Sequence, residues 1–185
     1  NISFFKYGWC FGFGYFLCSL YWITISLTFD QNFYFLIPFA VVLIPSFLAL
    51  FYGLVTYLFS IFYSKKIINS ILIFSLFFGL IEFIRGSILT GFPWNLISFS
   101  FSNSIYFIQI ISIIGTYSFN LICITLFTLP AVFVLKKSKK NIVFVSGFIL
   151  VTVSFVIFGI YQIKEFNVLP SLKKTYSIKA ISSNI

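Results

Sequence analysis

Residues 67–89 read IINSILIFSLFFGLIEFIRGSIL, an apolar run that contains a single acidic and a single basic side chain. A helix rises about 1.5 Å per residue, so a helix of this length crosses the hydrocarbon core of a bilayer, which is about 30 Å thick. Inside that core no water satisfies the backbone N–H and C=O groups. The run is therefore predicted to be a membrane-spanning helix, although its Phe and Ile residues also favour strands.

Similar runs recur along the 185-residue chain, of which 61% is hydrophobic and 8% charged. A soluble domain of this size has too much surface for its volume to hide so many apolar side chains. Five spans are predicted, at residues 7–29, 35–62, 67–89, 106–135 and 141–163. The predicted fold class is an all-α polytopic membrane helix bundle that occupies residues 1–163.

Lysines mark every second connection around the predicted spans. Lys6 precedes the first span, Lys65 and Lys66 separate the second from the third, and a cluster at residues 136–140 separates the fourth from the fifth. By the positive-inside rule these connections are cytoplasmic, so the chain after the fifth span lies outside the cytoplasm. The net charge of +9 does not indicate nucleic-acid binding, because the lysines stand in short groups at the ends of apolar runs, where they contact anionic lipid.

The composition changes after the fifth span. Residues 164–175 are polar and contain Pro170, which predicts a linker, and residues 176–181 alternate in the manner of a strand. We expect that strand, within residues 176–185, to open a soluble α/β domain that is truncated here. The chain has no Met and ends inside this strand, so we expect it to be a fragment open at both ends.

Glu82 and Arg85 are the two opposite charges well inside an apolar run. They are three residues apart on a predicted helix, so they share a face and can pair. One interpretation is a structural ion pair that fixes helix packing, with Arg85 extending toward the headgroups. The other is functional, with Arg85 contacting a lipid phosphate or the loop that follows.

That loop begins with the residues Thr90, Gly91, Phe92, Pro93 and Trp94. Proline disfavours a helical conformation at the residue before it, and glycine permits a turn that other residues resist, so the third span ends here. The tryptophan is predicted to lie at the membrane interface, where its indole is half wet. An aromatic anchor at the end of a helix would account for the same residues.

Cys10, Cys18 and Cys123 all lie inside apolar runs. No two of them have the C-x-x-C spacing of a metal or redox site, and the chain has no His. We interpret the three as small packing residues and predict neither a metal nor a cofactor.

Several of these motifs occur together, in order, in one known family. The stretch from Glu82 to Arg85, followed by the Thr-Gly-Phe-Pro-Trp loop at residues 90–94, resembles the signature of the apolipoprotein N-acyltransferases. Gly115 and Tyr117, with Asn120 three residues later, resemble the next helix of that family. Residues 8–22 resemble its earlier glycine-rich helix ending in Tyr-Trp, and residues 180–185 its first nitrilase-like strand, with Ser182 and Ser183 where the family usually has Gln before Asn-Ile.

The resemblance implies a reaction and two lipid-linked partners. Members of this family take an acyl chain from a phospholipid donor and place it on the α-amino group of an S-diacylglyceryl cysteine in an apolipoprotein acceptor. A Cys nucleophile forms a thioester, a Glu acts as base and a Lys stabilises the oxyanion. This triad is expected beyond Ile185, so no catalytic residue is assigned here.

The resemblance also implies a place in the cell and a set of motif residues. It implies a multi-pass protein of the bacterial inner membrane that acts as a monomer, with its C-terminal side in the periplasm. The candidate lipid-facing or motif residues are Glu82, Arg85, Thr90, Gly91, Phe92, Pro93, Trp94, Gly115, Tyr117 and Asn120.

Three alternatives remain open at this point. A transporter or channel subunit would need polar or broken helices near the midplane, and the five runs are almost free of charge there. A simple membrane anchor for another extracytoplasmic domain requires neither the buried pair nor the shaped loop. A nitrilase-like domain that carries out a different amide or acyl reaction would share the same membrane part.

Overall fold

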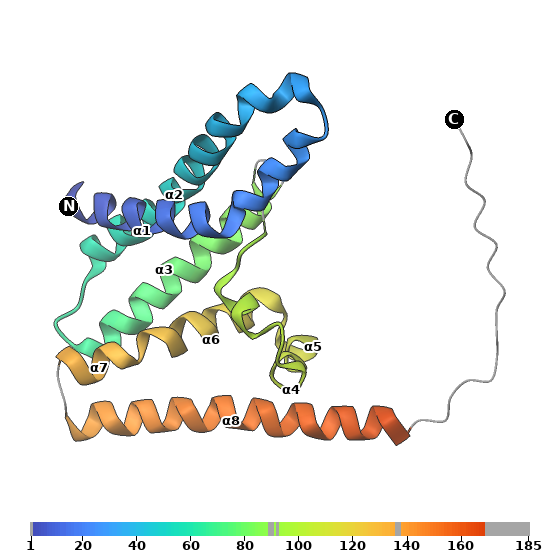
Figure 1. The fold of residues 1–185 in the computed structure, drawn as a ribbon. Coiled ribbons are helices and arrows are strands. Elements are labelled where there is room, and N and C mark those ends of the chain that lie inside the picture. The colour runs from blue at the N-terminus through green and yellow to red at the C-terminus, as the bar shows by residue number, and fades with distance from the viewer. Residues whose placement is uncertain (1, 89–90, 92, 136–137, 169–185) are drawn as a thin grey trace.

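Five long apolar helices organise the chain in a computed structural model that describes residues 2–88, 91, 93–135 and 138–168 (Figure 1). These described residues are mostly helical and include no strand. The predicted all-α helix bundle is therefore confirmed for them. The predicted strand at residues 176–181 and the start of the α/β domain lie outside the described residues.

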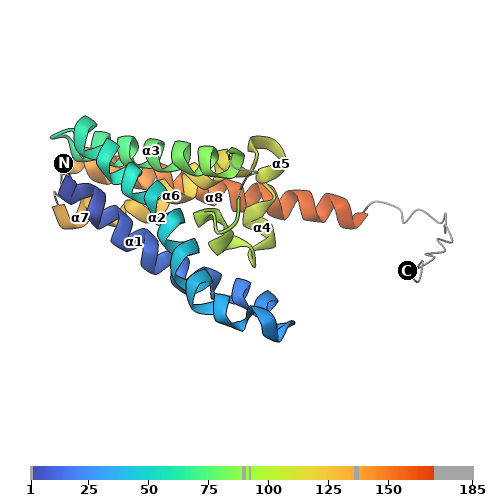
Figure 2. The ribbon, with the colours of Figure 1, turned by 90° about the horizontal axis from the view of Figure 1, so that it is seen from above.

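The first two long helices form an antiparallel hairpin. Helix α1 (Ile2–Leu20) continues into the 3-10 segment η1 (Tyr21–Thr28), and a second 3-10 segment, η2 (Gln31–Leu36), leads into α2 (Ile37–Phe62). Asp30 makes the turn between them, because its carboxylate accepts a hydrogen bond of 2.9 Å from the N–H of Asn32. The tip of the hairpin extends away from the other helices (Figures 1 and 2).

Close packing of α1 against α2 depends on small residues. A Cβ atom on Gly12 would lie 2.9 Å from the Cβ of Tyr52 and 3.1 Å from the Cα of Ala49. Gly8 lies closer still to α2, where an added Cβ would meet the hydroxyl of Thr56 and the carbonyl oxygen of Tyr52. Small residues four apart on one face let two membrane helices approach closely, which increases their van der Waals contact.

The centre of the bundle is helix α3 (Ile67–Ser87), which packs against α2 and α6 (Thr116–Thr128). The main buried cluster joins α1, α2, α3 and α6 and consists of Phe16, Leu20, Leu48, Tyr52, Val55, Phe78, Ile81 and Ile124. Many other large apolar side chains are exposed on the outside of the helices. That distribution fits helices surrounded by lipid.

The fourth predicted span, residues 106–135, is wrong as one continuous helix. Its first part forms two single-turn helices, α4 (Ile105–Ile108) and α5 (Ile111–Ile114). The helix ends at Gly115, which has φ +78° and ψ 163°, a conformation that is open to glycine and strained for other residues. The long apolar helix therefore begins only at Thr116.

From there the fourth long helix runs to Leu135 as α6 followed by α7 (Pro130–Leu135). Pro130 divides the two, because proline lacks the N–H that would continue the helical hydrogen bonds. A small buried cluster packs α7 against the starts of α3 and α8 and contains Ile71, Leu129, Val132 and Val145.

The last helix, α8 (Lys139–Val168), is longer than the predicted span of 141–163. The predicted linker at 164–175 is therefore wrong at its start, since residues 164–168 continue the helix. Tyr161 and Glu165, one turn apart, support this extension through a hydrogen bond of 2.7 Å. Residues 169–175 of that linker lie outside the described residues.

The connections sort to the two ends of the bundle (Figure 1). The start of α1, the α2–α3 connection and the start of α8 lie at one end, and these segments carry Lys6, Lys65, Lys66, Lys139 and Lys140. The turn between η1 and η2 and the end of α8 lie at the opposite end. This arrangement is the one that the alternating lysine pattern requires.

Candidate functional site

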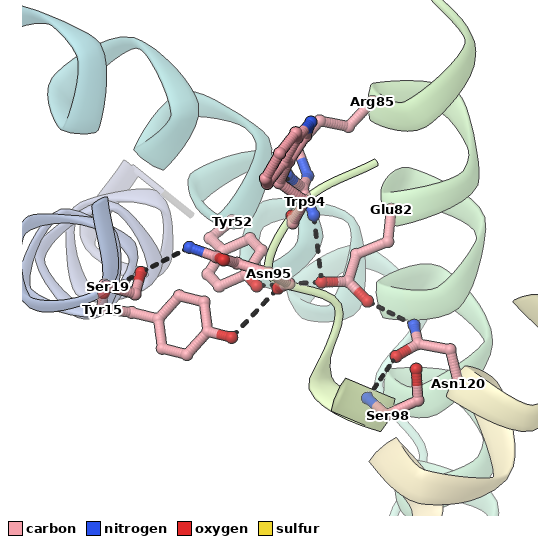
Figure 3. Close-up of polar contacts among 9 residues, drawn as sticks. All are labelled: Tyr15, Ser19, Tyr52, Glu82, Arg85, Trp94, Asn95, Ser98 and Asn120. Carbon is pink, nitrogen blue, oxygen red and sulfur yellow. Dashed lines mark hydrogen bonds and ion pairs between the residues drawn. The ribbon is translucent and has the colours of Figure 1, made fainter. Parts of the chain in front are cut away.

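The candidate site is the loop that follows α3, residues 93–101, which we call the 93–101 loop. It contains a turn at Trp94 and Asn95 and ends in the 3-10 segment η3 (Ile97–Phe101). Asn95 has φ +57°, the left-handed conformation that asparagine tolerates better than most residues. Side chains from three helices bind the backbone or a side chain of this loop (Figure 3).

Arg85 of α3 binds the beginning of the loop from inside the bundle. Its Nη1 donates a hydrogen bond of 3.0 Å to the carbonyl oxygen of Trp94, and its guanidinium lies 5.3 Å from the ring centroid of Phe16. Only 2% of Arg85 is exposed. The idea that Arg85 extends to the headgroups is thus wrong, because the guanidinium is held between an aromatic ring and a backbone carbonyl.

Glu82, one turn earlier on α3, is completely buried and supplies the negative charge for Arg85. Its Oε1 lies 3.5 Å from Nη2 of Arg85 and accepts a hydrogen bond of 2.9 Å from the hydroxyl of Tyr52 on α2. Its Oε2 accepts a hydrogen bond from Nδ2 of Asn120 on α6. One carboxylate therefore joins three helices.

Asn120 also holds the far part of the loop. While its Nδ2 donates to Glu82, its Oδ1 accepts a hydrogen bond of 2.9 Å from the backbone N–H of Ser98. Both Asn120 and the Ser98 backbone are buried. The amide thus links the buried carboxylate directly to the start of η3.

Helix α1 holds the middle of the loop. The hydroxyl of Tyr15 donates a hydrogen bond of 3.0 Å to the carbonyl oxygen of Asn95, and Nδ2 of Asn95 donates one of 2.7 Å to Oγ of Ser19. Ser19 in turn donates to the carbonyl oxygen of Tyr15, at 2.7 Å. The loop is therefore bound at Trp94, Asn95 and Ser98 by α3, α1 and α6.

The physical setting explains why the contacts are so dense. Charges and polar groups inside a membrane protein are costly unless they are paired, and a buried ion pair is tolerated only when hydrogen bonds satisfy its remaining atoms. Removing one member leaves the others buried without partners. We infer that the cluster fixes one position of the 93–101 loop.

An open pocket of about 420 Å³ lies beside this loop. Its walls are formed by Pro93, Trp94, Leu96, Phe99, Thr116 and Tyr117, which are mostly aromatic or apolar. Trp94 is 53% exposed, and its ring lies 5.5 Å from that of Trp22. Tyr117 packs edge-on against Phe83 at 5.1 Å. An apolar pocket of this size suits a hydrocarbon chain better than a polar solute.

The structure separates the predicted residues into two groups. Glu82, Arg85 and Asn120 form the buried cluster, whereas Pro93, Trp94 and Tyr117 line the pocket. The two predicted glycines allow backbone conformations that other residues rarely adopt, since Gly91 has φ +77° and Gly115 has φ +78°. Thr90 and Phe92 lie outside the described residues.

Sequence reasoning missed Tyr15, Ser19, Tyr52, Asn95 and Ser98 as parts of the site. A signal was present, because a polar side chain within an apolar run needs a partner in lipid. The partner could not be named, however, since Tyr52 lies 30 residues from Glu82 and Tyr15 lies 80 residues from Asn95.

The cysteines take no part in this site. Cys123 is buried in α6, while Cys10 and Cys18 are exposed on α1, and all three are free thiols. Across the part of the chain that the structure describes, no group of three or more His, Cys, Asp or Glu side chains could hold a metal ion. The contacts of the cluster to Trp94 and Ser98 suit it to positioning a loop.

The same residues lie within a recognised family domain. A family model for the apolipoprotein N-acyltransferase N-terminal domain matches residues 1–126, which include Glu82, the loop and Asn120. The chain belongs to the apolipoprotein N-acyltransferase family. This membership, together with the five apolar helices, makes it a multi-pass bacterial membrane protein and does not favour a transporter or channel subunit.

Individual relatives support the family assignment. The apolipoprotein N-acyltransferase of Rickettsia prowazekii is 39% identical over 160 residues, which cover 85% of this chain and 32% of the relative. That of Rhizobium etli is 36% identical over 138 residues, covering 74% and 26%. That of Brucella melitensis is 38% identical over 127 residues, covering 68% and 24%. The chain thus spans about a third or less of the length of the curated apolipoprotein N-acyltransferases that it matches. No solved structure gave a significant match.

Proposed function

We propose that this chain is the membrane part of an enzyme that transfers an acyl chain from a phospholipid to the α-amino group of the N-terminal S-diacylglyceryl cysteine of apolipoproteins. Family membership supports the reaction type, and five apolar helices support access to lipid substrates. The proposed location is the bacterial inner membrane, with the C-terminal side in the periplasm and the protein acting as a monomer.

The observation that carries the proposal is the pocket beside the 93–101 loop. Its walls include Trp94 and Tyr117, and the polar cluster around Glu82 determines where the loop stands. A hydrocarbon chain entering from the bilayer would meet apolar walls without losing any hydrogen bonds. We propose that the pocket binds an acyl chain of one of the two lipid substrates.

The chemistry belongs to a downstream domain in this proposal. A Cys thiol beyond Ile185 attacks the ester carbonyl of the phospholipid, forming a thioester and releasing a lysophospholipid that takes up the thiol proton. The α-amine of the acceptor then attacks the thioester, forming the amide and regenerating the thiol. The membrane part binds and orients the lipids, so the 185 residues alone are expected to be inactive.

The test is acyl transfer by the full-length protein that carries this chain. The purified enzyme in phospholipid micelles is given a diacylglyceryl lipopeptide, and the N-acylated product is measured by mass spectrometry. We expect Trp94→Ala to lower kcat/KM about tenfold or more, equivalent to about 1.4 kcal/mol of lost transition-state stabilisation. Phe39→Ala, which removes an exposed aromatic ring from α2, is the matched control and should change little.

Two results would count against the proposal. Absence of N-acylation by the intact full-length protein would refute the proposed reaction. Equal kcat/KM values for the Trp94→Ala, Phe39→Ala and unaltered proteins would be compatible with the reaction but would show that the pocket does not bind the lipid substrate.

A further inference from the structure

A second pocket, of about 440 Å³, lies at the opposite end of the bundle from the tip of the α1–α2 hairpin. Lys65, Lys66 and Asn69 line it from the α2–α3 connection and the start of α3, and Ser138, Lys140 and Asn141 line it from the start of α8. We call this the lysine pocket. It shares no lining residue with the pocket beside the 93–101 loop.

Among the residues that the structure describes, no acidic side chain lies beside the lysine pocket to balance its positive charge. The chain contains three of them, Asp30, Glu82 and Glu165. Asp30 is at the hairpin tip, Glu82 is buried 15 residues into α3, and Glu165 is near the far end of α8. At about 1.5 Å per residue, Glu82 is roughly 22 Å along its helix from the pocket.

The backbone adds to this electrostatic field. Residues 67–69 are the first turn of α3, so their N–H groups have no carbonyl acceptor within the helix, and no side chain caps that helix. The start of α8 lines the other wall. Helix N-termini carry partial positive charge and favour anions, and here two of them adjoin the lysines.

We propose that the lysine pocket binds the phosphate of an anionic phospholipid headgroup, such as that of phosphatidylglycerol. The pocket lies at the ends of helices that are long and apolar enough to cross a membrane, and basic pockets between membrane helices are suited to such lipids. Its size lies within the range of small-molecule sites. A bound headgroup joins the start of α8 to the start of α3.

The experiment uses the full-length protein purified in neutral detergent. Thermal unfolding is measured after addition of phosphatidylglycerol, phosphatidylcholine or inorganic phosphate. Phosphatidylglycerol is expected to raise Tm by about 3–8 °C, because a ligand that binds only the folded state stabilises it. Phosphatidylcholine, which has no net charge, and free phosphate, which has no acyl chains, should raise it by less than half as much.

Matched variants test the location. Lys65→Gln/Lys140→Gln removes one charge from each wall and leaves Lys66 and Lys139 in place, whereas Lys6→Gln/Lys164→Gln removes two charges outside the pocket. The first variant should lose at least half of the phosphatidylglycerol effect, and the second should retain it. Equal stabilisation of both variants would overturn the proposal, as would equal effects of the three additives.

A second measurement uses the unaltered protein, in case the first variant does not fold. An amine-reactive reagent is applied with and without phosphatidylglycerol, and labelling is quantified by peptide mass spectrometry. Lys65 and Lys140 should be labelled severalfold more slowly with the lipid, and Lys6 and Lys164 should be unaffected. Uniform protection, or none, would reject the site. These readouts do not involve acyl transfer, so the outcome is independent of the proposed enzymatic reaction.

Discussion

Glu82 is the residue on which the buried cluster depends, because side chains from three helices meet at its carboxylate. It receives hydrogen bonds from Tyr52 and Asn120 and pairs with Arg85, all away from solvent. In such a setting the loss of one charge costs more than the pair itself contributes, since the remaining charge stays buried. These contacts hold the 93–101 loop in its position.

We predict that Glu82→Gln lowers the free energy of unfolding by about 3–5 kcal/mol, because the guanidinium of Arg85 stays buried without its counter-charge. The measurement is reversible unfolding in detergent micelles. Glu165→Gln, which removes an exposed carboxylate from α8, serves as control and should cost less than about 0.5 kcal/mol. Equal losses for the two variants would show that Glu82 does not hold the cluster together.

The double variant Glu82→Met/Arg85→Met separates stability from loop position. Replacing a buried ion pair by apolar side chains of similar size is often neutral or stabilising, so most of the stability lost in Glu82→Gln should return. Acyl transfer by the full-length protein should stay low, because the carbonyl oxygen of Trp94 loses its hydrogen bond from Arg85, and Asn120, which binds Ser98, loses its own partner at Glu82. Recovery of both properties would refute a positioning role for the cluster.

Asn95 provides a test of the loop backbone. Asn95→Ala loses the hydrogen bond to Ser19 and places a Cβ-bearing residue that lacks a local hydrogen bond at φ +57°. We expect the free energy of unfolding to fall by about 2 kcal/mol. About 1 kcal/mol comes from the lost hydrogen bond and about 1 kcal/mol from the strained backbone conformation. Asn95→Gly loses only the hydrogen bond and should cost about half as much. A larger loss for glycine than for alanine in thermal unfolding would contradict this.

At the scale of the elements, the sequence predicts the helices better than their contacts. Five apolar runs were enough to predict five long helices, since a helix satisfies the hydrogen bonds of its own backbone in lipid, where no water is present. The break at Gly115 was missed, because an apolar run on either side conceals a turn that depends on one φ angle. Helices that are apolar on all faces also carry little information on which face is buried. The i,i+3 spacing of Glu82 and Arg85 predicted their pairing, whereas Asn120 is 38 residues away from Glu82.

The α1–α2 contact leads to a prediction with an internal control. Gly12→Ala should lower the free energy of unfolding by about 1–3 kcal/mol, because the added Cβ would lie 2.9 Å from the Cβ of Tyr52 and force the helices apart. A Cβ on Gly14 meets no atom of the described chain within 4 Å, so Gly14→Ala should be neutral or stabilising by up to about 1 kcal/mol. Thermal unfolding of both variants measures the difference, and equal effects would rule out close packing at Gly12.

At the scale of the whole molecule, the two ends of the bundle have different chemistry. One end carries Lys6, Lys65, Lys66, Lys139, Lys140 and the lysine pocket, and the other carries the aromatic hairpin tip. The sequence predicted this division, because charge in short connections alternates with the spans. It could not predict the spread of α3, α6 and α8 away from one another, which depends on side-chain packing at the lysine end (Figure 1).

Orientation in the membrane follows from the same division and can be measured directly. In a full-length protein with Cys10, Cys18, Cys123 and any cysteine beyond residue 185 replaced by Ala, single cysteines are introduced as Tyr63→Cys and Gln31→Cys, both at exposed positions at opposite ends of the bundle. A membrane-impermeant maleimide applied to spheroplasts should label residue 31 and should reach residue 63 only after lysis. The lysine-bearing connections resist translocation, so the hairpin tip is the end that crosses. The reverse labelling pattern would place the lysine pocket outside, carry the end of α8 into the cytoplasm and exclude a periplasmic catalytic domain after residue 185.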